Sequence, residues 1–163
     1  MLRRVEVHSD DPDATRIVAR ALGDRLAEGP GGAIVLLTGP LGAGKTVFVQ
    51  GLAAALGVST PVKSPTFALE HRHNGRRALH HFDLYRLSAG NDLAELGLAE
   101  LMAGPDVVAI EWPDRLDAVP EDAIHVSLDW PPGSDPGSDR RVILIEGPAA
   151  RLDGLVIETG GVS

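Results

Sequence analysis

The residues with the clearest chemical signature form a short glycine-rich run, Gly39–Thr46. The run matches the pattern G-x-x-x-x-G-K-S/T at every fixed position. Glycines let the backbone curl so that successive N–H groups point at phosphate oxygens, and a following helix presents its positive end to the same anion. We expect Lys45, on a solvent-facing loop mouth, to reach the β- and γ-phosphates, and the Thr46 hydroxyl to ligate Mg²⁺. The residues predicted to contact the nucleotide are Gly39, Leu41, Gly42, Ala43, Gly44, Lys45, Thr46 and Val47.

A phosphate loop of this kind works with a further metal carboxylate at the end of a neighbouring strand. Glu111 follows the uniformly apolar run Val107–Ile110, which is typical of a buried parallel strand. We therefore predict that Glu111 is a metal ligand. Asp83 lies near the end of a second strand-like run, Arg77–Asp83. For Asp83 the pattern alone leaves two interpretations open, a functional carboxylate or a solvated acid at a strand end.

Two other features have both a functional and a structural interpretation. The hydroxyl-rich run Ser64–Phe67 follows the first nucleotide-binding helix, where P-loop enzymes often carry a switch that senses the γ-phosphate. An ordinary turn fits the same residues, and Thr66 is the candidate switch residue. Trp112 comes directly after Glu111 and is either an exposed anchor or a core aromatic residue.

Histidines cluster around Asn74–Gly75, a strong hairpin signal. We predict that His71, His73 and His80 share one face of this hairpin, a pattern that can indicate zinc. No acidic fourth ligand lies beside them in the sequence, so we favour polar strand positions over a metal site. His81 shares a face with Asp83 by the strand period of two and is a candidate to orient that carboxylate.

The elements that must position these residues alternate between strand and helix patterns. Expected strands cover Arg4–His8, Ala33–Thr38, Phe67–Arg72, Arg77–Leu84, Val107–Glu111, Ala123–Leu128 and Arg141–Ile145. Expected helices begin at Ser9–Pro12 and end at Gly29, cover Lys45–Leu56, and cover Asn91–Met102 with a break at Gly97. This order predicts an α/β fold, a P-loop NTPase-like mixed sheet flanked by helices, with an inserted β-hairpin. Residues 148–163 receive no assignment.

Composition limits the class of protein. With 163 residues we expect a single P-loop domain over residues 1–163. The absence of cysteine excludes disulfides, thiol catalysis and cysteine-based metal sites. The longest apolar run, Ala33–Leu37, is far shorter than the ~20 residues of a membrane helix, and the N-terminal residues lack an apolar signal segment, so we expect a cytoplasmic protein without a membrane. A net charge of −8 argues against bulk attraction to nucleic acid phosphates.

Several sequence blocks together resemble one family, the bacterial ATPase subunit of tRNA threonylcarbamoyladenosine biosynthesis, TsaE. The blocks occur in family order, span roughly residues 4–130, and are Gly39–Thr46, Ser64–Phe67, His81–Leu87, Glu95–Leu98 and Ile110–Pro113. The resemblance implies a Mg²⁺-dependent, cytoplasmic ATPase that hydrolyses ATP to ADP and phosphate. It also implies that a sugar-kinase-like pair of partner subunits transfers threonylcarbamoyl to the adenosine beside the anticodon. The ATPase would support turnover of these subunits and meet tRNA only indirectly.

The resemblance assigns roles to individual residues. Lys45 would contact phosphates, while Thr46 and Glu111 would hold Mg²⁺. Asp83 would position or activate the attacking water. Thr66 would be the switch residue.

The resemblance also implies that Trp112 acts beside the site. The chain departs from the family pattern at two positions in and next to the phosphate loop. Pro40 stands where the family usually has an acid, and Val47 where it often has a second threonine. Pro40 removes one backbone N–H from the early turn of the loop. Beyond Asp129 the match is loose, and Trp130 is a candidate for the adenine pocket.

Two other functions compete with this interpretation. A small-metabolite kinase needs an acceptor pocket and an arginine-bearing lid, and the pair Arg76–Arg77 at a hairpin tip is short for a lid. A binding module could use ATP without hydrolysing it. The guanine-binding motif of GTPases needs an aspartate two residues after a lysine. In this chain Val47 stands at that position after Lys45, and Pro65 stands there after Lys63, so a GTPase is disfavoured.

Overall fold

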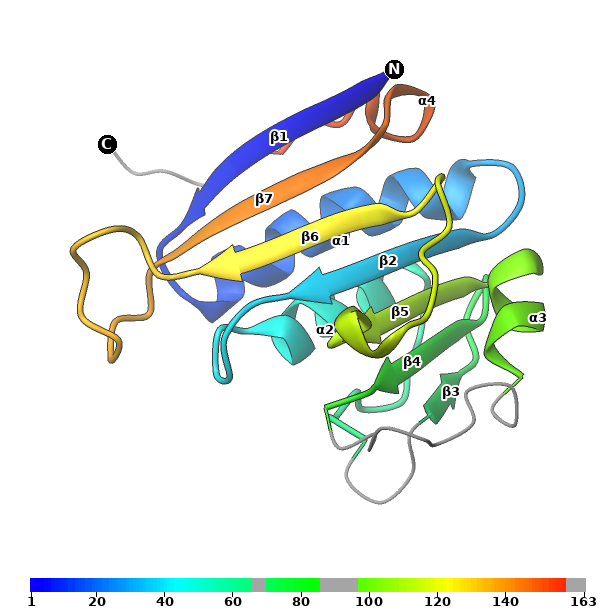
Figure 1. Ribbon diagram of the computed structural model, residues 1–163, viewed down its shortest axis with the longest axis horizontal. Helices are drawn as coiled ribbons and strands as arrows, with labels where there is room; N and C mark the ends of the chain where they lie inside the picture. Colours follow the sequence, from blue (N-terminus) through cyan, green and yellow to red (C-terminus); the bar gives the residue numbers. More distant parts are fainter. Residues whose placement is uncertain (66–69, 86–96, 158–163) are drawn as a thin grey trace.

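The computed structural model describes residues 1–65, 70–85 and 97–157 (Figure 1). They contain a seven-stranded sheet with the order β1-β7-β6-β2-β5-β4-β3. The strands are Leu2–Ser9 (β1), Ala33–Thr38 (β2), Glu70–His73 (β3), Leu79–Asp83 (β4), Val107–Glu111 (β5), Ile124–Asp129 (β6) and Arg141–Pro148 (β7). The helices are Pro12–Glu28 (α1), Lys45–Ala55 (α2), Leu98–Ala103 (α3) and Ala149–Leu152 (α4), with a short 3₁₀ turn, η2, at Pro113–Arg115.

The sheet is mixed, as the sequence predicts. Strands β6, β2, β5 and β4 run parallel to one another in the middle, and β1, β7 and β3 pair antiparallel with their neighbours. The carboxyl ends of the parallel strands therefore meet along one edge of the sheet. In open α/β sheets this edge is where ligands bind.

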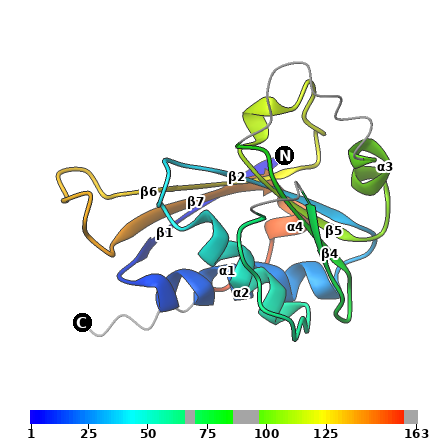
Figure 2. The same ribbon diagram turned by 90° about the horizontal axis from the view of Figure 1, so that it is seen from below.

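Helices cover the sheet on both faces (Figure 2). Helices α1 and α2 pack on one face, where Leu22 and Phe48 contact the core side of β2. On the other face, α3 and the segment after β5 cover β2, β5 and β4, with Leu98 packed near Phe82. Side chains of β2 point alternately into both layers, and accordingly the strand is apolar and buried from Ala33 to Leu37.

Helix α1 begins where the sequence predicts. The Asp11 side chain accepts a hydrogen bond from the backbone of Ala14 at 2.8 Å, and Pro12 occupies the first turn. Gly51 lets α1 and α2 approach closely, because a Cβ at this position would lie 2.4 Å from the Arg16 carbonyl oxygen. No helix in the described ranges is long and apolar enough to cross a membrane.

The hairpin β3–β4 differs in detail from the prediction. Strand β3 ends at His73 and β4 begins at Leu79, so the connection spans residues 74–78 rather than the two residues Asn74–Gly75. Gly75 packs against the Leu56 carbonyl, which holds the connection beside the end of α2. The predicted strand residues 67–69 and helix residues 91–96 lie outside the described residues. At the other end of the chain, β7 extends to Pro148 and α4 follows it.

Candidate nucleotide-binding site

The loop Gly39–Gly44 connects β2 to α2 at the carboxyl edge of the parallel strands. The register places Glu111 beside Leu37 on one side and beside Asp83 on the other. A cavity of about 360 Å³ lies at this point. The predicted site residues that line it are Leu41, Gly42, Gly44, Lys45, Thr46, Val47, Asp83, Glu111 and Trp112. Residues from three separate parts of the chain therefore meet in one cavity.

The backbone of the loop has the conformation that its glycines allow. Gly39, Gly42 and Gly44 all have positive φ angles, of 147°, 81° and 103°. At Gly39 a Cβ would also lie 2.3 Å from the Leu128 carbonyl oxygen, so this position accepts only glycine. The loop leads into α2, whose first-turn amides lack partners within the helix and suit an anion.

Pro40 does not leave the early turn of the loop unsupported. Its carbonyl oxygen accepts a hydrogen bond from the Ala43 amide at 3.1 Å and another from Lys45 Nζ at 2.9 Å. The Ala43 side chain is fully buried in the core. The loop is thus held to the core by the buried Ala43 side chain, and its turn is stabilised by the hydrogen bond to the Pro40 carbonyl.

The expectation that Lys45 faces solvent is wrong. The residue is only 5% exposed, and its ammonium group donates to the carbonyl oxygens of Gly39 (2.7 Å) and Pro40 (2.9 Å). Burial lowers the pKa of Lys45 from its ordinary value, and the carboxylates of Glu111 and Asp83 oppose this shift. The loop curls around the lysine, which explains why a charged side chain is buried here.

Glu111 accepts hydrogen bonds from two residues. Thr46 Oγ1 lies 3.2 Å from Oε1 and 3.1 Å from Oε2, and His81 Nε2 lies 2.5 Å from Oε2. Glu111 is 3% exposed and His81 is fully buried. The hydroxyl and the carboxylate are hard oxygen donors of the kind that Mg²⁺ prefers. Sequence reasoning pairs His81 with Asp83, but the structure pairs it with Glu111.

Asp83 lies at the same edge, one strand further out. Its Oδ2 accepts from the Ser64 hydroxyl at 2.9 Å, and its Oδ1 accepts from the backbone of Tyr85 at 3.0 Å. The side chain lines the cavity that also contains Lys45 and Glu111. Thr66, the predicted switch residue, lies outside the described residues, although the nearby Ser64 reaches Asp83.

The predicted face shared by His71, His73 and His80 is wrong. The β3–β4 register pairs His71 with His81 and places His80 opposite Arg72, on the other face of the hairpin. His80 instead lies between Glu70 (2.8 Å) and Asp106 (2.9 Å). In the ranges described, no group of three or more His, Asp and Glu side chains is arranged to hold a metal ion.

Trp112 lies at the mouth of the site. Its ring centre is 4.2 Å from Lys45 Nζ and 4.9 Å from the centre of the Tyr85 ring. Its φ angle is 61°, and among the described residues no other residue except glycine has a positive φ. Such a conformation costs energy for a bulky residue and persists where its surroundings demand it. Trp112 lines the cavity and also packs on the adjacent core.

Sequence reasoning missed Arg141, which braces the phosphate loop from β7. Its guanidinium donates to the carbonyl oxygens of Ala43 (2.9 Å) and Gly42 (3.3 Å). The same group lies 4.5 Å above the centre of the Trp130 ring. Trp130, the candidate for the adenine pocket, thus supports Arg141 beside the loop. No sequence signal connects residues 98 positions apart.

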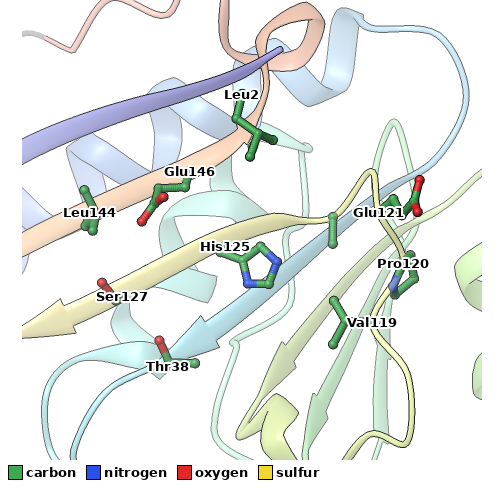
Figure 3. Close-up of a pocket in the computed structure, with 11 residues that line it drawn as sticks. Leu2, Thr38, Val119, Pro120, Glu121, His125, Ser127, Leu144 and Glu146 are labelled. Carbon is green, nitrogen blue, oxygen red and sulfur yellow. The ribbon is translucent and has the colours of Figure 1, made fainter.

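A larger cavity, of about 580 Å³, lies on the face of the sheet opposite α1 and α2 (Figure 3). It is lined by His125 and Ser127 of β6, Leu144 and Glu146 of β7, and Thr38. None of the phosphate-loop residues lines it, whereas Leu41, Lys45 and Thr46 line the smaller cavity.

The mixed sheet, with its glycine-rich loop between a buried parallel strand and a helix, defines a P-loop NTPase-like fold of the α/β class. The family model described as "Threonylcarbamoyl adenosine biosynthesis protein TsaE" matches residues 9–137. The chain belongs to the TsaE family.

Individual relatives agree with this assignment. The chain is 43% identical over 98 residues to the tRNA threonylcarbamoyladenosine biosynthesis protein TsaE of Treponema pallidum, covering 60% of this chain and 73% of that protein. For TsaE of Nostoc sp. the identity is 39% over 125 residues, covering 74% and 75%. For TsaE of Bacillus subtilis it is 30% over 129 residues, covering 78% of each. The crystal structure of Bacillus subtilis YdiB superposes with a TM-score of 0.75 at 26% identity, covering 98% of this chain and 96% of that chain.

Proposed function

We propose that this protein binds ATP with Mg²⁺ in the 360 Å³ cavity, hydrolyses it, and thereby supports the subunits that transfer threonylcarbamoyl to tRNA. The observation that carries the proposal is the contact between the Thr46 hydroxyl and the Glu111 carboxylate, at 3.1 Å, beside the phosphate loop. The two groups come from α2 and β5 and supply oxygen donors next to an anion site. This combination suits a phosphate chain with a divalent cation.

Thr46 and Glu111 would hold the cation, which neutralises charge on the phosphates when it is bound. Lys45 contributes a second positive charge on the same side of the cavity. Its donors contact the Gly39 and Pro40 carbonyls, so nucleotide binding exchanges these contacts for phosphate oxygens. Burial disfavours the charged form of Lys45 and lowers its pKa, so an anionic phosphate beside it would stabilise the ammonium form.

Asp83 would orient the attacking water. It is the second carboxylate that lines the cavity, and it lies beside Glu111 in the β4–β5 register. Thr46 contacts Glu111 directly, which leaves Asp83 for a role other than holding the cation. A carboxylate positioned at the water contributes general-base or orienting catalysis.

A partner subunit would act at the mouth of the cavity. Tyr85 is 47% exposed, and its ring contacts the Trp112 ring at a tilt of 45°; Trp112 itself contacts Lys45. A protein docked on this aromatic pair would sense the state of the lysine and the phosphates. The net charge of −8 favours a protein partner over direct tRNA capture.

The arrangement of the hairpin arginines does not favour the kinase alternative. Arg76 donates to the Ala55 carbonyl at 2.6 Å, and Arg77 donates to the carbonyls of Gly29 (2.8 Å) and Gly31. Gly31 precedes the start of β2, whereas the phosphate loop follows its end. These arginines therefore act structurally, far along the sheet from the phosphates.

Thermal unfolding with ATP, ADP and GTP, each with and without Mg²⁺, tests nucleotide binding. Ligand at 100 times its dissociation constant should add about 2.7 kcal/mol to the free energy of unfolding. We expect the adenine nucleotides to stabilise the protein and Mg²⁺ to strengthen the effect of ATP. No stabilisation by any nucleotide would contradict the proposal.

Hydrolysis is tested by ATP turnover with and without the threonylcarbamoyl-transferring subunits. We expect slow hydrolysis by the protein alone and acceleration by the partners. An unchanged rate, without co-elution in ATP, would refute the partner role. Formation of a phosphorylated metabolite in a panel of nucleosides and sugars would favour the kinase.

A further inference from the structure

The carboxylate of Glu111 has a second buried contact that the nucleotide chemistry does not use. His81 Nε2 lies 2.5 Å from Oε2, and the imidazole is fully buried. Thr46 Oγ1 contacts both carboxylate oxygens at 3.1–3.2 Å. Helix α2 and strands β4 and β5 therefore each contribute one side chain to this group.

The strand register explains why His81 reaches Glu111. In the parallel pair β4–β5, His81 lies beside Ala109, and Asp83 lies beside Glu111. Alternate residues of a strand share a face, so His81 and Glu111 point to the same side of the sheet. The small Ala109 side chain leaves room for the imidazole to extend along the strand toward the carboxylate.

The hydrogen-bond pattern selects one form of the histidine. Since the Glu111 carboxylate only accepts, the hydrogen lies on Nε2. His81 Nδ1 is buried without a hydrogen-bond partner in the described part of the chain. A hydrogen on Nδ1 would be a buried donor without an acceptor, which is costly. The neutral Nε2–H tautomer is the form that satisfies both conditions.

We propose that His81 is a positioning residue whose Nε2–H fixes the Glu111 carboxylate toward Thr46 and the nucleotide-bound cation. The inference rests on the proposed function. A carboxylate that is hydrogen-bonded on one oxygen keeps the other in a defined direction, and loss of such outer partners typically costs about 10–100-fold in metal affinity. His81 itself touches neither the nucleotide nor the cation.

The test measures binding of Mn²⁺ to the full chain saturated with a non-hydrolysable ATP analogue, with free Mn²⁺ followed by electron paramagnetic resonance. His81→Phe keeps a buried ring but removes the donor, and should raise the dissociation constant for Mn²⁺ about 10–100-fold. His81→Gln places an amide N–H near the former Nε2 and should recover most of the affinity. Binding of the analogue without metal should be unchanged in both variants.

His80→Phe is the matched control, because it replaces a neighbouring buried histidine on the other face of the hairpin. It breaks the contacts with Glu70 and Asp106, so it should lower the melting temperature without changing Mn²⁺ affinity. Unchanged Mn²⁺ affinity in His81→Phe, or His81→Gln as weak as His81→Phe, would overturn the role of His81. A wild-type protein that binds no Mn²⁺ with nucleotide would overturn the proposed function instead.

A spectroscopic measurement tests the contact without any nucleotide. Long-range ¹H–¹⁵N spectra of the histidine rings in the ligand-free protein should show His81 as the Nε2–H tautomer. Glu111→Ala should shift its ring resonances, while Asp106→Ala should shift those of His80. A Nδ1–H tautomer at His81 would contradict the geometry on which the proposal depends.

Discussion

The ammonium group of Lys45 lies 4.2 Å from the centre of the Trp112 ring, while its hydrogens are directed to the carbonyl oxygens of Gly39 and Pro40. A residue expected to extend into solvent is thus enclosed between its own loop and an aromatic side chain. The Trp112 ring in turn contacts the tilted ring of Tyr85, which is 47% exposed. The site is therefore connected to the surface through this aromatic pair.

Replacement of Trp112 by alanine should weaken coupling to the partner more than nucleotide binding. In the proposed complex the phosphates would contact the loop and α2, whereas Trp112 connects Lys45 to the exposed Tyr85. We expect Trp112→Ala to reduce the partner-induced acceleration of ATP turnover more than the affinity for ATP, and Trp112→Phe to retain part of the acceleration. Turnover with and without partner, and ATP affinity, are the measurements. Equal losses in both would contradict this division.

Replacement of Lys45 should impair nucleotide binding through the loss of charge. Lys45→Met keeps most of the buried volume, and Lys45→Ala also leaves a gap beneath the Trp112 ring. Loss of a charged hydrogen bond of about 1.5–3 kcal/mol predicts roughly 10–100-fold weaker ATP binding in both variants. Calorimetric titration with ATP measures the affinity, and the melting temperature separates the packing effect. Normal ATP hydrolysis by either variant would refute the phosphate-loop assignment.

Glu111→Gln and Asp83→Asn should produce different defects. Glutamine keeps the shape of Glu111 but is a poorer ligand for a hard cation, so the Mg²⁺ dependence of ATP binding should shift to higher concentration. Asp83→Asn should spare binding and lower the single-turnover rate, since the proposed role of Asp83 is at the water. If the two variants show the same defect, the division of roles is wrong.

Arg141→Ala should loosen the phosphate loop from outside the cavity. The variant loses donors to the Ala43 and Gly42 carbonyls, and each hydrogen bond contributes about 1 kcal/mol. We expect weaker ATP binding and a lower melting temperature. Arg140→Ala is the control, because Arg140 is exposed and contacts Asp10 at 3.7 Å. Equal effects of the two substitutions would show that the brace is unimportant.

His73 should contribute to acid sensitivity. Burial lowers the pKa of His73 from its ordinary value of 6.5. The unfolded chain then binds the proton more readily than the folded protein, so stability is lost as pH falls from about 6.5 toward the folded pKa. Urea unfolding between about pH 7.5 and 5.5 should show a smaller loss for His73→Gln than for wild type. An equal loss in both proteins would exclude this contribution.

Much of the fold follows from short stretches of sequence. Strands β2 and β5 have the predicted bounds, and Asp11 caps α1 as expected, because contiguous apolar runs and caps are local signals. The tip of the hairpin was less predictable. Its connection packs against Leu56, a contact that the pair Asn74–Gly75 does not encode.

The positions of the phosphate loop and of Glu111 at the end of a buried strand could be predicted without any structure. The eight residues Gly39–Thr46 carry their conformational requirements internally, and Glu111 ends a fully buried strand. The spacing of residues within a strand determines which of them share a face and which stand at its end. The sequence therefore predicts which residues lie at the carboxyl edge of the parallel strands.

How those residues contact one another depends on the assembled fold. The pairing of His81 with Glu111, the separation of His80 from His71, and the position of Arg141 under the loop all depend on strand order and register. Strand order and register depend on how whole helices and strands bury their apolar faces together, and they bring together residues as far as 98 positions apart. The burial of Lys45 has the same origin, since the loop closes on the lysine only when β2, β5 and α2 are assembled.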